Sequence, residues 1–429
     1  MRSITKYCSI AVLTLSIIVL ASCGSKEQKQ ATPKSEKQNI AVDTALQSKL
    51  NKFATKPRCK GNFGLYVYDI TADKVVYANN EHQLQPSASC MKLLSGVAGL
   101  HQLGVNYKYH SAVYTNGSVK GDTLHGDIAF KGDLDPQLTP AEVKDMAHIM
   151  KQLKGFKTFT GKFYIDILMP NQIQKEQHWY DYDLTLSKFS ILFRGKDFVE
   201  RTLKTAFRQE GFKFKDDQIV FAPLPRTSHC VFRLNRDISM VIRRMWKNSA
   251  NTQATSLLYT IGYTANPKNP DYASSGIAYM KQFMKNELKS TEKGIVIHDG
   301  CGLCTQDQLT PYFLCEILRY GYAHKDIYNM LYQFLAVSGQ DGTLRRWPQT
   351  MKEKVRAKTG TLSHPYGISS LAGYARGNNG HLLCFAIMDS EMSVLDAHVL
   401  QKDLCEILVS DPNNKGSVTN RVGNLSLLE

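Results

Sequence analysis

Strand-like segments lie near both ends of this chain of 429 residues, and helical patterns fill most of the sequence between them. Residues 63–70 alternate like a strand and residues 75–77 return after a short turn, which predicts a β-hairpin. Residues 370–375 and 381–388 flank a Gly-Asn-Asn-Gly turn and predict a second hairpin. We therefore expect an α/β fold of the α+β type, with an antiparallel sheet built from both ends of the chain and flanked by helices.

Helical periodicity predicts the layers that cover this sheet. The expected helices are residues 41–53, 89–103, 237–247, 252–262, 272–288, 310–322, 325–336 and 393–409. Residues 106–234 differ, with short strands, turns such as Asn116-Gly117, and helices near 140–153 and 196–210. We interpret 106–234 as a smaller inserted α+β domain, 41–105 with 235–411 as the main domain, and 412–429 as a loose C-terminal tail.

The first 23 residues have the features of an export signal. Arg2 and Lys6 precede an apolar run over residues 10–21 that ends in small residues. The following Cys23 completes a sequence that resembles the bacterial lipobox, in which the cysteine is acylated. Residues 24–40 predict a flexible linker. We expect a periplasmic, cell-envelope protein that is lipid-anchored to a bacterial membrane, with the outer membrane favoured. An ordinary signal peptide with a chance cysteine is the alternative.

The formal net charge of +15 suits an anionic partner. For an exported protein we expect an acidic cell wall or an anionic lipid surface and no nucleic acid, although simple solubility explains the charge equally well. No run of about 18 apolar residues follows the export signal, so no transmembrane helix is expected. Disulfides are permitted in this compartment, but Cys315, Cys384 and Cys405 lie in apolar runs that favour buried thiols.

A serine followed three residues later by a lysine is a candidate nucleophile and base. A serine hydroxyl needs a base to take its proton, and residues three apart on a helix face the same way. The pattern occurs at Ser3-Lys6, Ser89-Lys92 and Ser290-Lys293. Only Ser89 opens a predicted helix, whose free N–H groups favour an oxyanion. Alone, this pair is equally well explained as a surface serine and a solvated lysine.

Two further motifs strengthen the assignment of Ser89 and Lys92. Ser249-Ala250-Asn251 is the only Ser-x-Asn in the chain, and Lys358-Thr359-Gly360 is its only Lys-Thr-Gly. The second lies just before the C-terminal hairpin, where an edge strand can line a cleft. The three motifs occur together in penicillin-binding proteins and class A β-lactamases.

On these motifs the chain resembles the DacB-type low-molecular-mass penicillin-binding proteins (the penicillin-binding protein 4 family), which are D-alanyl-D-alanine carboxypeptidases and endopeptidases. Residues 132–139, 299–304 and 339–344 are similar to the family's Gly-Asp-Pro-x-Leu-Thr, Asp-Gly-Ser-Gly-Leu-Ser and Gly-x-Asp-Gly-Thr-Leu segments. The resemblance covers most of residues 45–408 and implies a penicillin-binding/β-lactamase-like transpeptidase fold.

The resemblance implies an acyl-serine mechanism. Ser89 is expected to attack the carbonyl of the penultimate D-alanine of a peptidoglycan stem peptide, and Lys92 to take its proton. That requires a neutral amine, so we expect burial and the second cation, Lys358, to lower the pKa of Lys92. The family uses no metal or cofactor, and its partners are peptidoglycan and β-lactam antibiotics, which acylate the serine.

The remaining motif residues are assigned by the same resemblance. Ser249 is expected to relay a proton to the leaving group, and Asn251 to hold the peptide backbone. Lys358, Thr359 and Thr361 are expected to bind the terminal carboxylate. Backbone N–H groups of Ser89 and Thr361 are expected to form the oxyanion hole.

Some positions depart from the family pattern. Ala250 replaces the usual acid of the middle motif, which puts the rigidity of that loop in doubt. Cys90 follows the nucleophile directly, and the sequence offers no reason for it. Cys301 and Cys304 stand where the family has serines and are interpreted as small structural residues; the alternative is a redox pair or, with His298, half a metal site.

Two other functions stay open. A β-lactamase shares the three motifs, although the inserted domain and the additional family segments argue against it. A non-catalytic peptidoglycan-binding lipoprotein is the second, and the intact set of motif residues argues against it. The motifs do not distinguish carboxypeptidase from endopeptidase activity, because both cleave the bond after a D-alanine carbonyl.

Overall fold

The structure is a computed structural model that describes residues 40–56 and 61–410. The predicted signal peptide 1–23 with Cys23, the linker as far as residue 39, and the predicted tail 412–429 lie outside the described residues. Within the described ranges, no helix combines the length and the apolar character that crossing a membrane requires.

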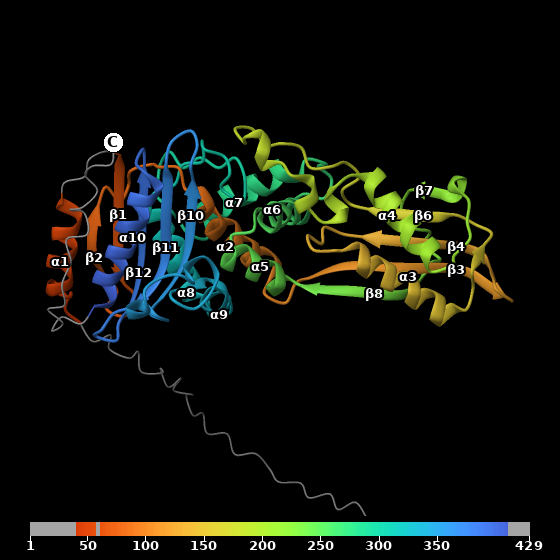
Figure 1. Ribbon diagram of the computed structural model, residues 1–429, viewed down its shortest axis with the longest axis horizontal. Helices are drawn as coiled ribbons and strands as arrows, with labels where there is room; N and C mark the ends of the chain where they lie inside the picture. Colours follow the sequence, from red (N-terminus) through yellow and green to blue (C-terminus); the bar gives the residue numbers. More distant parts are fainter. Residues whose placement is uncertain (1–39, 57–60, 411–429) are drawn as a thin grey trace, which may run out of the picture. The chain divides into compact units, whose positions relative to one another are not determined.

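The first sheet joins strands from the two ends of the chain. Its antiparallel order is β2 (Lys74–Asn79), β1 (Asn62–Asp69), β12 (Leu382–Ser390), β11 (Ile368–Arg376), β10 (Val355–Leu362) and β9 (Ala336–Val337). Figure 1 shows β1, from the start of the chain, beside β12, from its end. The antiparallel sheet expected from the two terminal hairpins is confirmed.

Helices cover both faces of this sheet because its central strands are apolar on both faces. In β1, Leu65 and Val67 enter one hydrophobic cluster while Tyr66 and Tyr68 enter another, as the alternation of side chains along a strand requires. The first cluster also contains residues of α1 (Thr44–Thr55) and α10 (Val394–Val409). The second contains those of α2 (Met91–Leu103) and α8 (Pro311–Ala323).

The helix α2 lies in the centre of the second cluster. All its residues from Met91 to Leu100 are buried, including Lys92. It is surrounded by α5 (Ile238–Lys247), α6 (Asn251–Ala265), α7 (Tyr272–Asn286), α8 and α9 (Lys325–Phe334). The predicted helices are therefore present, each within a few residues of its expected bounds. The burial of α2 is what places an amine inside the protein core.

The second sheet is built from strands between residues 108 and 237. Its order is β7 (Ile219–Phe221), β6 (Phe163–Ile167), β4 (Thr123–Gly132), β3 (Lys108–Lys120) and β8 (His229–Asp237), with β5 (Thr158–Phe159) beside β4. Figure 1 shows α3 (Pro140–Lys154) and α4 (Lys196–Gln209) against it. A single hydrophobic cluster runs from α2, α5 and α6 into this sheet, so the predicted division into domains stays a prediction.

The turn predicted at Asn116-Gly117 is wrong. Both residues pair within β3, opposite Asp127 and Gly126 of β4, and the chain reverses at residues 121–122 instead. The two glycines face each other, and a Cβ on Gly117 would lie only 2.1 Å from the His125 carbonyl oxygen. Glycine is thus required here for the close approach of two strands, not for a turn.

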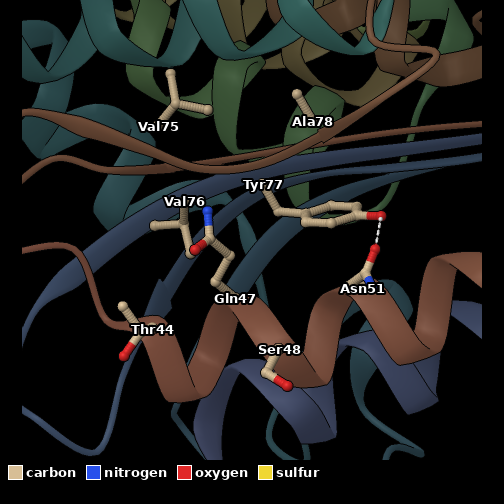
Figure 2. A pocket seen from close by; sticks show the side chains of 8 residues that line it. All are labelled: Thr44, Gln47, Ser48, Asn51, Val75, Val76, Tyr77 and Ala78. Atoms are coloured by element: carbon tan, nitrogen blue, oxygen red, sulfur yellow. Dashed lines mark hydrogen bonds between the residues drawn. The ribbon is translucent and has the colours of Figure 1, made fainter.

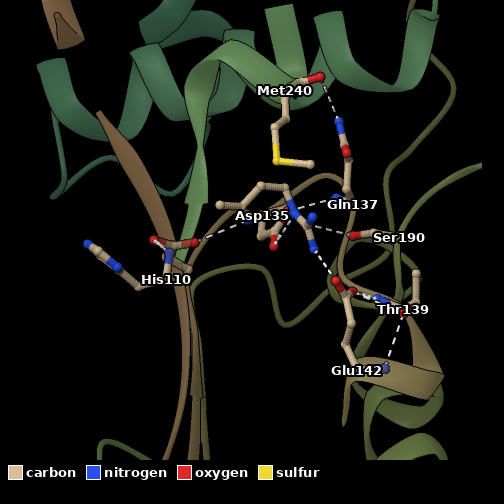
Figure 3. Close-up of polar contacts among 9 residues, drawn as sticks. His110, Asp135, Gln137, Thr139, Glu142, Ser190 and Met240 are labelled. Carbon is tan, nitrogen blue, oxygen red and sulfur yellow. Dashed lines mark hydrogen bonds and ion pairs between the residues drawn. The ribbon is translucent and has the colours of Figure 1, made fainter. Parts of the chain in front are cut away.

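Residues 133–139 connect the second sheet to the helices around α2. Arg236, at the end of β8, donates from Nε to both carboxylate oxygens of Asp135 at 2.9 Å and from Nη2 to Glu142 at 2.7 Å. The Gln137 amide donates to the carbonyl of Met240 in α5 at 3.2 Å (Figure 3). Burial raises the pKa of Asp135 despite the charge of Arg236. Removing the cation would therefore leave a buried carboxylate without its partner, which destabilises the fold.

Replacing Arg236 by leucine is expected to lower the free energy of unfolding by about 3–5 kcal/mol, because Asp135 keeps its burial and loses its donor. Urea unfolding followed by circular dichroism measures the change. The control is Arg233→Leu on the exposed side of the same strand, expected to change stability by no more than about 0.5 kcal/mol. Equal unfolding midpoints for the two variants would contradict the assignment.

Candidate active site

Ser89 lies in a single helical turn, Ala88–Cys90, that leads into α2. Ala88 has φ 42°, a left-handed conformation that is costly for a residue with a side chain and is held only by its surroundings. Two glycines allow neighbouring backbone to pack closely against Ala88 and Ser89 and so form these surroundings. A Cβ on Gly302 would lie 1.8 Å from the Ala88 carbonyl oxygen, and a Cβ on Gly360 would lie 3.0 Å from the Ser89 backbone nitrogen. The loop 299–304 and strand β10 therefore contact the turn that carries Ser89.

Lys92 Nζ has three polar neighbours and no exposed surface. It lies 2.8 Å from Ser89 Oγ, 2.8 Å from Asn251 Oδ1 and 2.6 Å from the Cys301 carbonyl oxygen. The two carbonyl-type oxygens can only accept hydrogen bonds. A neutral amine has two hydrogens, so these oxygens take both of them and the lone pair is left facing Ser89 Oγ. In that state Lys92 is placed to accept the serine proton.

Burial lowers the pKa of both lysines of the candidate site. It lowers the pKa of Lys92, and Cys301, Asp299 and Cys90 oppose the shift. Burial lowers the pKa of Lys358 well below its ordinary value, and the charge of Lys92 lowers it further. The sequence predicted a depressed pKa for Lys92 from burial and from Lys358 together. The structure gives burial as the cause at Lys92, and the repulsion between the two cations acts on Lys358.

The middle motif lies between α5 and α6. Ser249 has φ 58°, a second strained position, and Asn251 is the first residue of α6. Ala250 stands at the helix N-cap and provides no side-chain cap. The backbone N–H groups of Asn248 and Ala250 donate to the Arg244 carbonyl at 3.2 and 3.3 Å. Backbone hydrogen bonds thus hold the loop whose rigidity the missing acid put in doubt.

Strand β10 carries the third motif to the same place. Lys358 Nζ donates to Ser249 Oγ at 2.8 Å and to the Thr359 carbonyl at 2.6 Å. β9 pairs only with Arg356 and Ala357, so in the described structure the edge of β10 beyond them lines the site without a partner strand. The structure brings together Ser89, Lys92, Ser249, Asn251, Lys358 and Thr359.

Thr361 lies two residues beyond Thr359 on β10, and its side chain contacts α10. It is exposed, and its hydroxyl lies 3.2 Å from Nε2 of His398 in α10. No motif or spacing pointed to His398, which is 37 residues further along the chain. Thr343 was also missed as a neighbour, although it lies within a recognised family segment: its hydroxyl accepts from Thr359 at 2.9 Å.

Cys90 has a structural role that the sequence did not reveal. Its thiol is fully buried and donates to the Lys358 carbonyl at 3.2 Å, which joins the turn that carries Ser89 to β10. Burial also raises its pKa, so the group stays a thiol. Cys90 is therefore a packing and hydrogen-bonding residue beside Ser89.

Cys301 and Cys304 are buried free thiols. Burial raises the pKa of Cys301 well above its ordinary value and that of Cys304 to about 12. Thiolates are the form that binds metals and exchanges disulfides, and burial suppresses it here. This environment fits small structural residues. Among residues 40–56 and 61–410, no three His, Cys, Asp or Glu side chains are grouped as metal ligands.

Two cavities differ in their relation to these residues. The larger, about 660 Å³, lies between α1 and β2, where Tyr77 donates to Asn51 at 3.3 Å (Figure 2), and no motif residue lines it. The smaller, about 250 Å³, is bounded by Asn251 and Thr252 of α6, by Leu303, and by Trp179 and Tyr182 from the connection between β6 and α4. The second cavity therefore adjoins the candidate active site.

The chain is similar to known enzymes along most of its length. A model described as the D-Ala-D-Ala carboxypeptidase 3 (S13) family matches residues 46–191 and 186–409. D-alanyl-D-alanine carboxypeptidase DacB of Haemophilus influenzae is 18% identical over 412 residues, which covers 76% of this chain and 84% of that protein.

Solved structures share the fold. The crystal structure of penicillin binding protein 4 from Haemophilus influenzae superposes with a TM-score of 0.69 at 17% identity, covering 80% of this chain and 93% of that one. A predatory endopeptidase from Bdellovibrio bacteriovorus, solved in complex with an immunity protein, gives a TM-score of 0.57 at 16% identity, covering 81% and 93%. The penicillin-binding fold expected from the motifs is confirmed.

Proposed function

This chain belongs to the D-Ala-D-Ala carboxypeptidase 3 (S13) family, and we propose on that premise that it is a serine-type carboxypeptidase and/or endopeptidase of peptidoglycan that works through an acyl-serine intermediate. The observation that carries this proposal to the chain's own residues is the environment of Lys92 Nζ. Two acceptor oxygens occupy its hydrogens and leave its lone pair to Ser89 Oγ. A buried, oriented base beside a hydroxyl is what nucleophilic serine catalysis requires.

Acylation begins when Ser89 Oγ attacks the carbonyl carbon of the penultimate D-alanine and Lys92 takes the proton. The negative charge on the carbonyl oxygen is stabilised by the backbone N–H groups of Ser89 and Thr361. The close approach of Gly360 to Ser89 supports this pairing, because it brings the two chain segments together. Loss of one such donor typically slows catalysis by about 100- to 1000-fold.

Collapse of the intermediate requires a proton for the leaving nitrogen. Ser249 Oγ accepts a hydrogen bond from Lys358, so its own hydrogen is free to point at the leaving group. Lys358, Thr359 and Thr361 bind the carboxylate of the leaving D-alanine, and Asn251 holds the peptide backbone. Ser249 gives its proton to the leaving nitrogen and regains one from protonated Lys92, so both groups return to their starting states. Water then attacks the ester, Lys92 takes the water proton and returns it to Ser89 Oγ, and Ser89 is regenerated.

β-Lactams present a strained amide to the same nucleophile, so we propose that they acylate Ser89 covalently. The rival functions are less well supported. The family model spans residues 106–234, which were interpreted as an inserted domain, and this argues against a β-lactamase. The complete hydrogen-bonded set around Lys92 and Lys358 argues against a non-catalytic lipoprotein.

A digest of purified muropeptides by the full-length protein tests the function. We expect free D-alanine from pentapeptides, split cross-links from dimers, or both, resolved by liquid chromatography and mass spectrometry. Binding to isolated cell wall without any product would favour the non-catalytic alternative. Rapid catalytic turnover of a chromogenic cephalosporin would favour the β-lactamase.

We also propose that the enzyme works in the cell envelope and is tethered to a bacterial membrane, with the outer membrane favoured, through acylated Cys23. This is supported by the small residues before Cys23 and by the polar sequence that follows it. Two or more acyl chains hold a protein stably on a bilayer. The mass of the mature N-terminal peptide checks the modification.

A further inference from the structure

Asp299 is a buried carboxylate in the loop 299–304 that the acyl-serine mechanism leaves without a role. Oδ1 accepts hydrogen bonds from the backbone nitrogens of Cys301 and Gly302, and Oδ2 from those of Leu303 and Cys304. Oδ2 also accepts from the indole nitrogen of Trp179 at 2.7 Å. Five donors on one carboxylate fix the loop in a single conformation.

That loop forms one wall of the site around the general base. Its Cys301 carbonyl accepts from Lys92 Nζ at 2.6 Å, and its Gly300 carbonyl accepts from Ser95 of α2 at 2.7 Å. Gly302 packs against Ala88 beside the nucleophile. The carbonyl that takes one hydrogen of the neutral amine is therefore placed by the loop that Asp299 holds.

We propose that Asp299 is a positioning residue for acylation: it fixes the Cys301 carbonyl so that the lone pair of Lys92 faces Ser89, and Trp179, from the connection between β6 and α4, anchors it. The inference rests on the proposed function, in which Ser89 and Lys92 act as nucleophile and base. Because Trp179 also lines the cavity beside Asn251, the cavity wall and the base are held by one carboxylate.

The charge of Asp299 provides a readout that loop packing alone does not. The groups that face Lys92 are Ser89 and Cys90 from the nucleophile turn, Asn251 from α6, Asp299 and Cys301 from the loop, and Lys358 from β10. Of these, Asp299 supplies a carboxylate, and it raises the pKa of Lys92 against the effect of burial. Removing its charge is therefore expected to lower that pKa.

Asp307 provides a matched control. It is buried near Asp299 and accepts from the His298 backbone nitrogen at 2.7 Å. Burial, and then the charge of Asp299, raise the pKa of Asp307 well above its ordinary value, which favours its protonated form; its side chain also forms a hydrogen bond with Asp299. Asp307→Asn keeps the shape of the side chain and leaves an amide that can still donate to Asp299.

The experiment measures the second-order rate of acylation by a fluorescent penicillin between pH 5 and 10 in the full-length protein. Acylation needs neutral Lys92, so the rate falls as the pH drops below the pKa of Lys92. This falling part of the pH–rate profile is called its acidic limb here. Asp299→Asn is expected to lower the rate by about 100-fold, the cost of a misplaced reacting group, and to move the acidic limb to lower pH. Trp179→Phe keeps the Asp299 carboxylate but removes one of its hydrogen-bond donors, so the negative charge of Asp299 acts more strongly on Lys92. We expect the acylation rate to fall by about tenfold and the acidic limb to move to higher pH. Asp307→Asn is expected to match the wild type in both respects.

Opposite displacements of the limb in the Asp299 and Trp179 variants support the proposal. A wild-type rate in Asp299→Asn overturns it, and so does a reduced rate with an unmoved limb, because a merely loosened loop leaves the charge near Lys92 unchanged. If Asp299→Asn does not fold, Trp179→Phe decides by the direction of its limb. A wild-type protein that penicillin never labels contradicts the proposed function instead.

Discussion

Replacing Ser89 by alanine is expected to abolish covalent labelling by a fluorescent penicillin. The label is an ester on the serine oxygen, so without that oxygen no adduct survives denaturation and electrophoresis. The effect is therefore loss of the product, not a slower rate. Release of D-alanine and cleavage of cross-linked muropeptides are expected to be lost in the same variant, because they pass through the same ester.

The chain contains its own control for this experiment. Ser290 also precedes a lysine by three residues, but it lies outside any helix, and its hydroxyl donates to Glu316 at 2.6 Å. Ser290→Ala is expected to be labelled like the wild type. Labelling of Ser89→Ala at the wild-type level would show that another residue is the nucleophile and would refute the assignment.

Much of the fold was predictable because it follows from local sequence patterns. Alternation in the terminal hairpins predicted the first sheet, and periodicity predicted α2 and its neighbours. The Asn116-Gly117 turn failed for a physical reason: a glycine signals permissive backbone, and it does not say whether that freedom serves a turn or a close strand contact. The pairing of Gly117 with Gly126 is a long-range feature that only the assembled sheet reveals.

The motif residues of the site were predictable, but the groups that orient them were not. The Cys301 carbonyl belongs to the backbone, so no side chain in the sequence marks it as a partner of Lys92. The bond from Trp179 to Asp299 joins residues 120 positions apart, in segments with no shared pattern. Cys90 was visible but unexplained, because its role depends on the strand that carries Lys358.

Replacing Lys92 by methionine is expected to slow acylation by about 100- to 10,000-fold, the usual contribution of a positioned base. Methionine keeps the length and apolar stem of the side chain, so Ser89 retains its place on α2 and loses only its proton acceptor. The rate of penicillin labelling at a fixed pH measures the loss. A Lys92→Met protein that is labelled as fast as the wild type would assign the base to another group.

The same substitution is expected to change how stability depends on pH. The folded-state pKa of Lys92 is lowered by burial, whereas the unfolded chain has a value of about 10.4. Between these two pKa values the unfolded state binds more protons than the folded state. The buried amine therefore destabilises the fold most at pH below its folded-state pKa, and this destabilisation decreases as pH rises. The stability of Lys92→Met relative to the wild type should therefore increase as pH falls, by at most about 1.4 kcal/mol per pH unit within that window.

Lys293→Met is the matched control, because Lys293 is exposed and is the lysine of the Ser290-Lys293 pair. Because the Lys293 side chain is exposed in the folded protein, removing it is expected to leave the pH dependence of stability unchanged. Urea unfolding of the three proteins between pH 6 and 10 makes the comparison. A Lys92→Met difference as flat as that of Lys293→Met would mean that the amine is not desolvated, and would remove the reason why it can act as a base near neutral pH. The rest of the fold must therefore be stable enough to keep this amine buried beside Ser89, where its pKa is lowered.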